Sequence, residues 1–115
     1  MESAIENTEV KDTSNDMVVF QLFIADNSPA SEMAKQNIKA ICEKYLPNRY
    51  TLEIININEE PTFAIRENII TIPVLIKKFP LPVIRMAGDL SDTEKVLKGF
   101  YLPIYFSTDM KTDKK

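Results

Sequence analysis

The sequence predicts one domain of the α/β class, in which helices pack on a mixed sheet. Two observations predict it: a strand, helix and strand of suitable length for a parallel crossover in the first half, and a proline-rich hairpin followed by a helix start in the second. A length of 115 residues, with 44% hydrophobic and 27% charged residues, is sufficient for one hydrophobic core and too short for two.

The first strand is expected over Met17–Ala25, because this run is β-branched and aromatic with a single interior polar residue. Such a run suits a central strand that is covered on both faces. The strand breaks at Asp26. Ser28 then offers an N-cap oxygen, and Pro29 suits the first position of a helix.

A helix over Pro29–Leu46 is predicted by an apolar stripe with helical spacing, opposite a face of charged and amide side chains. Cys42 lies on the apolar stripe, so we expect it to act as a small hydrophobic core residue. The stripe consists of Ala34, Ile38, Ile41, Cys42 and Tyr45.

A second strand is expected over Tyr50–Ile57, where apolar residues alternate with polar ones. The strand, helix and second strand then imply a parallel, right-handed crossover. A short helix is expected within Asn58–Asn68, because Glu59, Glu60 and Pro61 suit a first helical turn.

Two hairpin strands are expected over Val74–Ile76 and Val83–Met86, joined at Phe79–Pro82. Three prolines confine them to short or edge strands, because proline fixes φ and lacks an N–H donor. The bond before each proline can be cis or trans, and the sequence leaves this open. The prolines are Pro73, Pro80 and Pro82.

After the hairpin, Ser91–Glu94 has the form of a capping box, with Ser91 as N-cap and Glu94 at N3. The final helix is expected to end at Pro103, with Gly99 in its interior at a cost of about 1 kcal/mol relative to alanine. The complete order of elements, with a proline before the third strand, is that of a thioredoxin-like domain. The apolar face of the final helix would comprise Val96, Leu97, Phe100, Tyr101 and Ile104.

The polar ends of the chain are expected to lie outside this domain. We expect residues 1–16 to form a mobile acidic tail, 17–105 the folded domain and 106–115 a polar tail. Both ends have too few apolar residues to offset the entropy that is lost on ordering.

Charge and hydropathy disfavour nucleic-acid and membrane partners. The formal net charge is -3, which gives no general attraction to phosphate backbones or anionic lipid. No apolar run approaches 18 residues, and the start of the chain lacks the basic-then-apolar order of a secretory signal. We therefore expect a cytoplasmic protein.

The sequence contains few residues that could act in catalysis or bind a metal or a cofactor. The chain has one cysteine, Cys42, and no histidine, which disfavours a zinc site and a cysteine hydrolase. The loop Ala25–Ala30 lacks the thiol that a thioredoxin-type enzyme needs, and Gly88 and Gly99 are too few for a phosphate-binding loop. We expect no enzyme activity, no cofactor and no metal, and a domain that binds another protein.

Two blocks of the second half, Pro80–Arg85 (PLPVIR) and Gly88–Asp92 (GDLSD), resemble the KaiB circadian-clock family. The similarity covers about Met17–Leu102. Further segments that fit the family pattern are Leu22–Ala25, Asn27–Pro29 with Ser31, Ile69–Leu75 around Pro73, Glu94–Leu97 and Gly99.

The resemblance implies a non-enzymatic regulator that binds KaiC, a hexameric ATPase that phosphorylates itself, and opposes its phosphorylation in a clock or in a timer or stress-response system. It also implies self-association as a dimer or tetramer. In clock members the C-terminal half has two arrangements, a thioredoxin-like ββα form that binds KaiC and an alternative ground state. Weak local coding permits such a pair of packings. The switch candidates are Pro73, Pro80, Pro82, Gly88 and Gly99.

Three residues fit the family pattern at positions that the resemblance assigns to partner binding: Tyr50, Lys77 and Arg85. Other positions depart from it. Residues that are often basic in clock members are replaced here, and Glu53 reverses the charge. These departures are Met33, Glu53 and Asn68, together with Asp26 in place of glycine and Tyr101 in place of an acidic residue.

The departures leave a second hypothesis open, because like charges oppose docking. In it the protein is a diverged KaiB-like adaptor for another signalling protein and no longer binds KaiC. A third hypothesis is a redox protein that uses Cys42 for an intermolecular disulfide, which its place on an apolar face disfavours.

Overall fold

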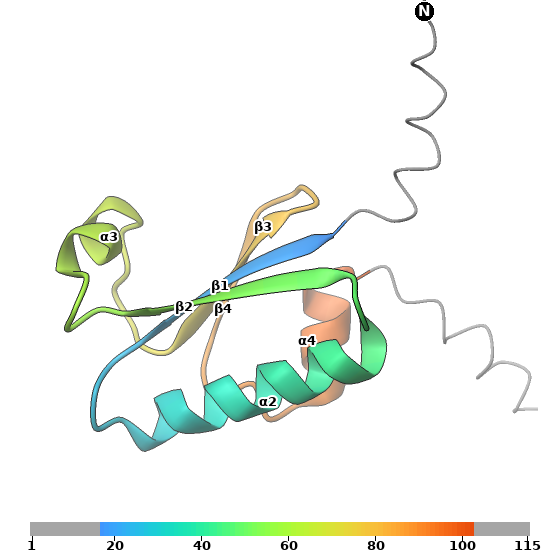
Figure 1. Ribbon diagram of the computed structural model, residues 1–115, viewed down its shortest axis with the longest axis horizontal. Coiled ribbons are helices and arrows are strands. Elements are labelled where there is room, and N and C mark those ends of the chain that lie inside the picture. The colour runs from blue at the N-terminus through green and yellow to red at the C-terminus, as the bar shows by residue number, and fades with distance from the viewer. Residues whose placement is uncertain (1–16, 103–115) are drawn as a thin grey trace, which may run out of the picture.

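The computed structural model describes residues 17–102, which form a four-stranded mixed sheet with helices on both faces (Figure 1). The order of elements confirms the thioredoxin-like α/β prediction. In chain order they are β1 (Val18–Ile24), α2 (Pro29–Tyr45), β2 (Tyr50–Asn56), α3 (Pro61–Arg66), β3 (Val74–Phe79), β4 (Ile84–Ala87) and α4 (Thr93–Gly99).

The strand order across the sheet is β2-β1-β3-β4. β1 and β2 run parallel from the pair Val18 and Tyr50 to the pair Ile24 and Asn56, which confirms the predicted crossover. β3 pairs antiparallel with β1 and with β4, which confirms the hairpin and gives β1 its interior place.

β3 differs from the short or edge strand that the prolines predict. It is six residues long and lies between β1 and β4. Pro73 and Pro80 stand immediately before and after the strand, so neither removes a donor from its ladder. The prolines therefore mark the limits of β3 and do not weaken its interior.

The start of α2 agrees with the sequence. The side-chain oxygen of Ser28 accepts a hydrogen bond from the Ser31 N–H at 3.1 Å, and Pro29 is the first helical residue. The hydroxyl of buried Ser31 in turn accepts the Ala25 N–H at 3.2 Å, so the helix start is fastened to the end of β1.

The start of α4 corrects the predicted capping box. Asp92 is the N-cap, and its Oδ1 accepts the Lys95 N–H at 3.1 Å. Ser91 lies outside the helix, and its own N–H donates to Asp89 Oδ1 at 3.0 Å. The aspartate side chains on either side of Ser91 make the local hydrogen bonds that the box assigned to Ser91 and Glu94.

The end of α4 comes earlier than predicted. Gly99 is the last helical residue, not an interior one, and Phe100 is the C-cap. Tyr101 has a φ of 52° and is 71% exposed, so it does not belong to the apolar face of the helix. Pro103 and Ile104 lie outside the described residues.

Two apolar layers hold the elements together. On the side of α2 and α4, the rings of Phe20 and Phe100 meet edge to face with centroids 5.6 Å apart. We call this layer the helix-side core. On the side of α3, Phe23 and Phe63 meet in the same way at 5.7 Å.

Both predicted tails, residues 1–16 and 106–115, lie outside the described residues. Within 17–102, no helix is long and apolar enough to cross a membrane.

Candidate functional site

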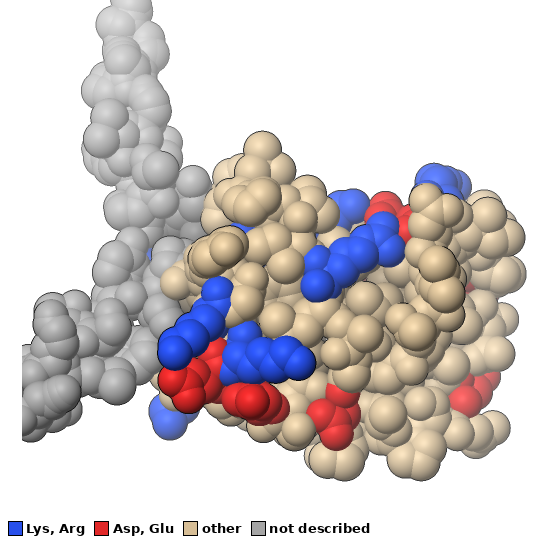
Figure 2. All heavy atoms as spheres, turned by 180° about the vertical axis from the view of Figure 1, so that it is seen from behind, with Lys and Arg blue, Asp and Glu red and all other residues tan. Residues whose placement is uncertain are grey.

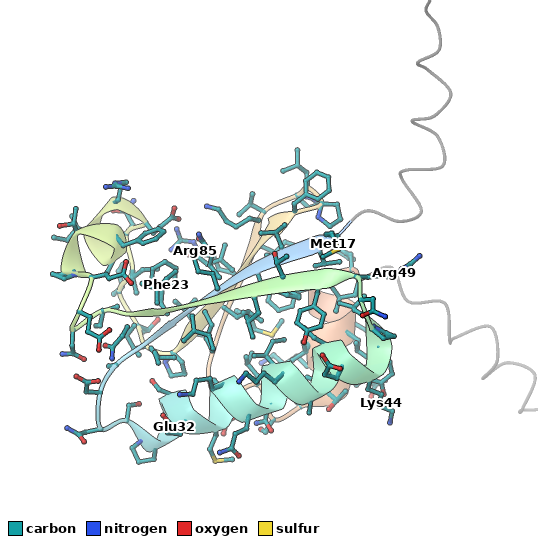
Figure 3. The ribbon with its side chains drawn as sticks, viewed as in Figure 1. Met17, Phe23, Glu32, Lys44, Arg49 and Arg85 are labelled. Atoms are coloured by element: carbon teal, nitrogen blue, oxygen red, sulfur yellow. The ribbon has the colours of Figure 1, made fainter. Side chains whose placement is uncertain are left out.

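The three predicted partner-binding residues lie on both faces of the sheet and do not form one cluster. Tyr50 pairs with Val18, and Lys77 pairs with Phe20, so both face the helix-side core. Arg85 pairs with Ile76 and faces α3. Figure 3 shows Arg85 on the side of the sheet away from α2.

Tyr50 lies at the start of edge strand β2, where its hydroxyl donates a hydrogen bond to Glu43 of α2. This bond to a carboxylate, with smaller contributions from burial and the Glu43 charge, raises the pKa of Tyr50 to about 12. The side chain is half-buried. Tyr50 can therefore offer a partner a neutral ring edge at the rim of the sheet.

Lys77 is buried, with 1% of its surface exposed, and its burial lowers the pKa of the amine. Among residues 17–102 its Nζ has no hydrogen-bond or ion-pair partner. In this arrangement Lys77 does not present its charge to the surface.

Arg85 fastens the segment that follows α3 to the edge strand β4. Its guanidinium donates to the backbone oxygens of Glu67 and Asn68 and lies 3.6 Å from the Glu67 carboxylate. Glu67 also accepts from Lys78 at 3.2 Å. The Arg85 side chain remains 43% exposed, so a partner can still reach it.

No local pattern in the sequence indicates Glu67 as the centre of this ion-pair group. Its partners lie 11 and 18 positions further along the chain. Asn37 was missed for the same reason: its side-chain amide donates to the Asp89 backbone oxygen, 52 positions away, at 2.9 Å. Such contacts follow from topology and not from local pattern.

The switch candidates fall into two structural classes. The bonds that precede Pro73, Pro80 and Pro82 are all cis, which answers the question the sequence left open. Gly88 has a φ of 114°, which favours glycine, and Gly99 allows a close approach of α4 to β4. A Cβ on Gly99 would lie 2.5 Å from the terminal methyl of Met86. Their part in a conformational switch stays a prediction.

The turn between β3 and β4, Phe79–Val83, is an exposed apolar projection that we call the hairpin tip. Phe79 is 42%, Leu81 73% and Val83 50% exposed. The lobe at the top of Figure 2 is tan, whereas blue and red side chains are spread over the middle, the lower left and the right of the same face. Exposed apolar side chains on a projecting turn are typical of protein-binding surfaces.

Other features of the described residues offer less to a ligand. A hollow of about 150 Å³ lies between β4 and α4, beside Gly88–Asp92 and Lys95. Within 17–102, no group of three or more His, Cys, Asp or Glu side chains could hold a metal ion.

The cysteine is unsuited to thiol chemistry in this arrangement. Cys42 is fully buried, and burial, with a smaller contribution from the Glu43 charge, raises its pKa to about 12. A thiol with such a pKa holds almost no thiolate at neutral pH. This environment therefore disfavours the redox hypothesis.

The positions that depart from the family pattern have different environments. Met33 is 46% exposed on α2, and Glu53 is exposed on β2, where it accepts from the Gln21 side chain at 3.0 Å. Asn68 has a φ of 56° at the end of α3, a conformation that asparagine tolerates. Met33 and Glu53 thus alter the surface, whereas Asn68 suits the backbone.

Comparisons with known proteins agree with the fold and the motifs. The family model described as "KaiB domain" matches residues 21–101. The chain is 45% identical to "Circadian clock protein KaiB3" of Synechocystis sp. over 82 residues, 71% of this chain and 80% of that protein. It is 40% identical to "Circadian clock oscillator protein KaiB" of Synechococcus elongatus over 84 residues, 73% of this chain and 82% of that protein.

Similar solved structures support the fold alone. The N-terminal domain of Synechococcus elongatus SasA has a TM-score of 0.61 at 23% identity, covering 75% of this chain and 85% of that domain. Chloroplastic thioredoxin z has a TM-score of 0.60 at 19% identity, covering 84% of this chain and 90% of that one.

Proposed function

This chain belongs to the KaiB family, and from that premise we propose that it is a non-enzymatic regulator that binds a KaiC-type ATPase and lowers its phosphorylation. The observation that carries the proposal is the extent of the family match, which spans residues 21–101 and includes both C-terminal blocks. Its curated relatives are circadian-clock proteins.

The arrangement of the C-terminal half supports the proposal. After β2 the chain runs helix, strand, strand, helix, which is the order of the form that the family resemblance links to KaiC binding. This order exposes the hairpin tip, where Leu81 and Val83 stand clear of both cores. We expect the tip to supply apolar contacts, with Tyr50 and Arg85 as polar contacts at the edges of the sheet.

The test is a dephosphorylation assay with a phosphorylated KaiC-type ATPase from the same organism. The ATPase is incubated for hours with and without this chain, and its phosphorylated fraction is followed on gels. We expect the fraction to fall faster with the chain present. Equal time courses, together with no complex on size-exclusion chromatography, would contradict the proposal.

Two apolar residues with nearly equal exposure give a matched pair of variants. Leu81 of the hairpin tip is 73% exposed, and Ile65 of α3 is 75% exposed. Leu81→Ser should weaken the complex by about tenfold or more, as expected for a buried apolar contact, while Ile65→Ser should leave it unchanged. Equal effects of the two variants would place the contact elsewhere.

The exposure of Glu53 and Met33 favours a second candidate, the diverged adaptor. Both side chains reach the surface where clock members are often basic. If these changes re-target the protein, the natural chain fails to bind a KaiC-type ATPase while the double variant Met33→Arg, Glu53→Lys binds it. Binding by the natural chain decides for the first candidate.

A further inference from the structure

Lys77 is a buried lysine on the face of β3 that carries the helix-side core. It follows Leu75 on the same face of β3 and lies in register between Phe20 of β1 and Ile84 of β4. Only 1% of its surface is exposed. The next residue, Lys78, has a different environment, because its side chain is 34% exposed and pairs with Glu67 at 3.2 Å.

The elements packed on this face offer Lys77 no negative charge. The residues that β1, β4 and α4 contribute to the helix-side core are apolar. The titratable groups of that layer are Cys42 and Tyr45 of α2 and Tyr50 of β2. The exposed Glu43 carboxylate accepts the Tyr50 hydroxyl, and within 17–102 no carboxylate pairs with Lys77.

Burial of the Lys77 side chain removes most of the water around its amine, which favours the neutral form. Two neighbouring titratable groups have pKa values above that of Lys77. Cys42 and Tyr50 have pKa values raised to about 12, and the chain has no histidine.

We propose that Lys77 is a proton-dependent element of the fold: its charged form loosens the packing of β3 against the helix-side core, and its neutral form tightens it. The inference stands independently of any partner. Because burial lowers the pKa of Lys77, the unfolded chain binds its proton more strongly than the folded chain does. The folded state should therefore gain stability as the pH rises from the lowered pKa of Lys77 towards about 10.4, the ordinary value for lysine.

The test is urea unfolding followed by far-UV circular dichroism at several pH values from 7 to 10. Three chains are compared: the natural chain, Lys77→Met, and Lys78→Met as the matched control on the same strand. The folding equilibrium constant of the natural chain and of Lys78→Met should rise with pH. Lys77→Met should be about tenfold or more better folded at pH 7, with a flatter pH profile.

A direct measurement keeps the proposal testable if a variant does not fold. In the natural chain labelled with ¹⁵N-lysine, NMR titration of the side-chain amines should show Lys77 losing its proton below the ordinary lysine value of about 10.4. An ordinary lysine titration of Lys77, or parallel pH profiles for the natural chain and Lys77→Met, would overturn the proposal.

Discussion

The end of α4 places a tyrosine where the backbone favours glycine. Tyr101 has a φ of 52°, its N–H donates to the Lys98 oxygen at 3.2 Å, and the Leu102 N–H donates to the Leu97 oxygen at 3.3 Å. These two bonds form a Schellman motif, whose left-handed position is usually occupied by glycine. We predict that Tyr101→Gly stabilises the domain.

The expected gain follows from three contributions. A residue with a Cβ pays about 1–2 kcal/mol in the left-handed region, and glycine escapes this cost. Glycine gives back about 0.4–1 kcal/mol, because it makes the unfolded chain more flexible. The tyrosine ring is 71% exposed, so little burial is lost. The net gain in the free energy of unfolding should lie between about 0 and 1.6 kcal/mol, with a middle value of about 0.8 kcal/mol, or a rise in Tm of roughly 3–6 °C.

Urea unfolding followed by circular dichroism measures this difference. Tyr101→Ala is the control, because it removes the ring but keeps the Cβ, and we expect its stability to stay near that of the natural chain. The reasoning fails if Tyr101→Gly is no more stable than the natural chain, or if Tyr101→Ala gains as much.

Three further predictions concern the C-terminal half. Phe100→Ala should lower the free energy of unfolding by about 3–5 kcal/mol in urea titrations, because a fully buried ring is removed; a loss below 1 kcal/mol would contradict its anchoring role. Calorimetry should show that Gly88→Ala lowers Tm, because Gly88 has a φ of 114° that alanine adopts only with strain. Gly99→Ala should lower Tm less, because only the flexible terminal methyl of Met86 must move. A larger effect of Gly99→Ala would be inconsistent with this geometry. Arg85→Gln should speed hydrogen exchange several-fold in the segment after α3; unchanged exchange would show that its bonds there are unimportant.

The first half of the fold could be predicted because its signals are local. The Ser28 oxygen and the fixed φ of Pro29 begin α2 without help from the rest of the chain. The apolar stripe that contains Cys42 then selects the face that packs on the sheet, and the structure buries it. The parallel crossover follows from the length of the unit.

The second half could be predicted in order but not in detail, because several residues compete locally. At the start of α4 both Ser91 and Asp92 could cap the helix, and the structure selects Asp92 while Asp89 accepts the Ser91 N–H. Nothing in the doublet Lys77 and Lys78 says which lysine enters the core. A bulge opposite β1, between the Val19 and Phe20 pairs, shifts the register there, and only tertiary pairing reveals it.

The family resemblance predicted the partner-binding residues, but it could not predict the burial and contacts of their side chains. Arg85 depends on the end of α3 and Lys77 on the helix-side core, both of which are tertiary features. The hairpin tip was foreseeable as a turn from its prolines, but its exposure was not, because exposure depends on what packs beside it.

Sedimentation velocity with a KaiC-type ATPase from the same organism tests most directly whether this chain is a KaiC-binding regulator. The 13.2 kDa chain, labelled with a dye, is incubated with the assembled ring and ATP for several hours before the run. The proposed function predicts a labelled species that sediments with the ring and is lost in Leu81→Ser but not in Ile65→Ser. Label that sediments only as the free chain, at concentrations up to tens of micromolar, would contradict it.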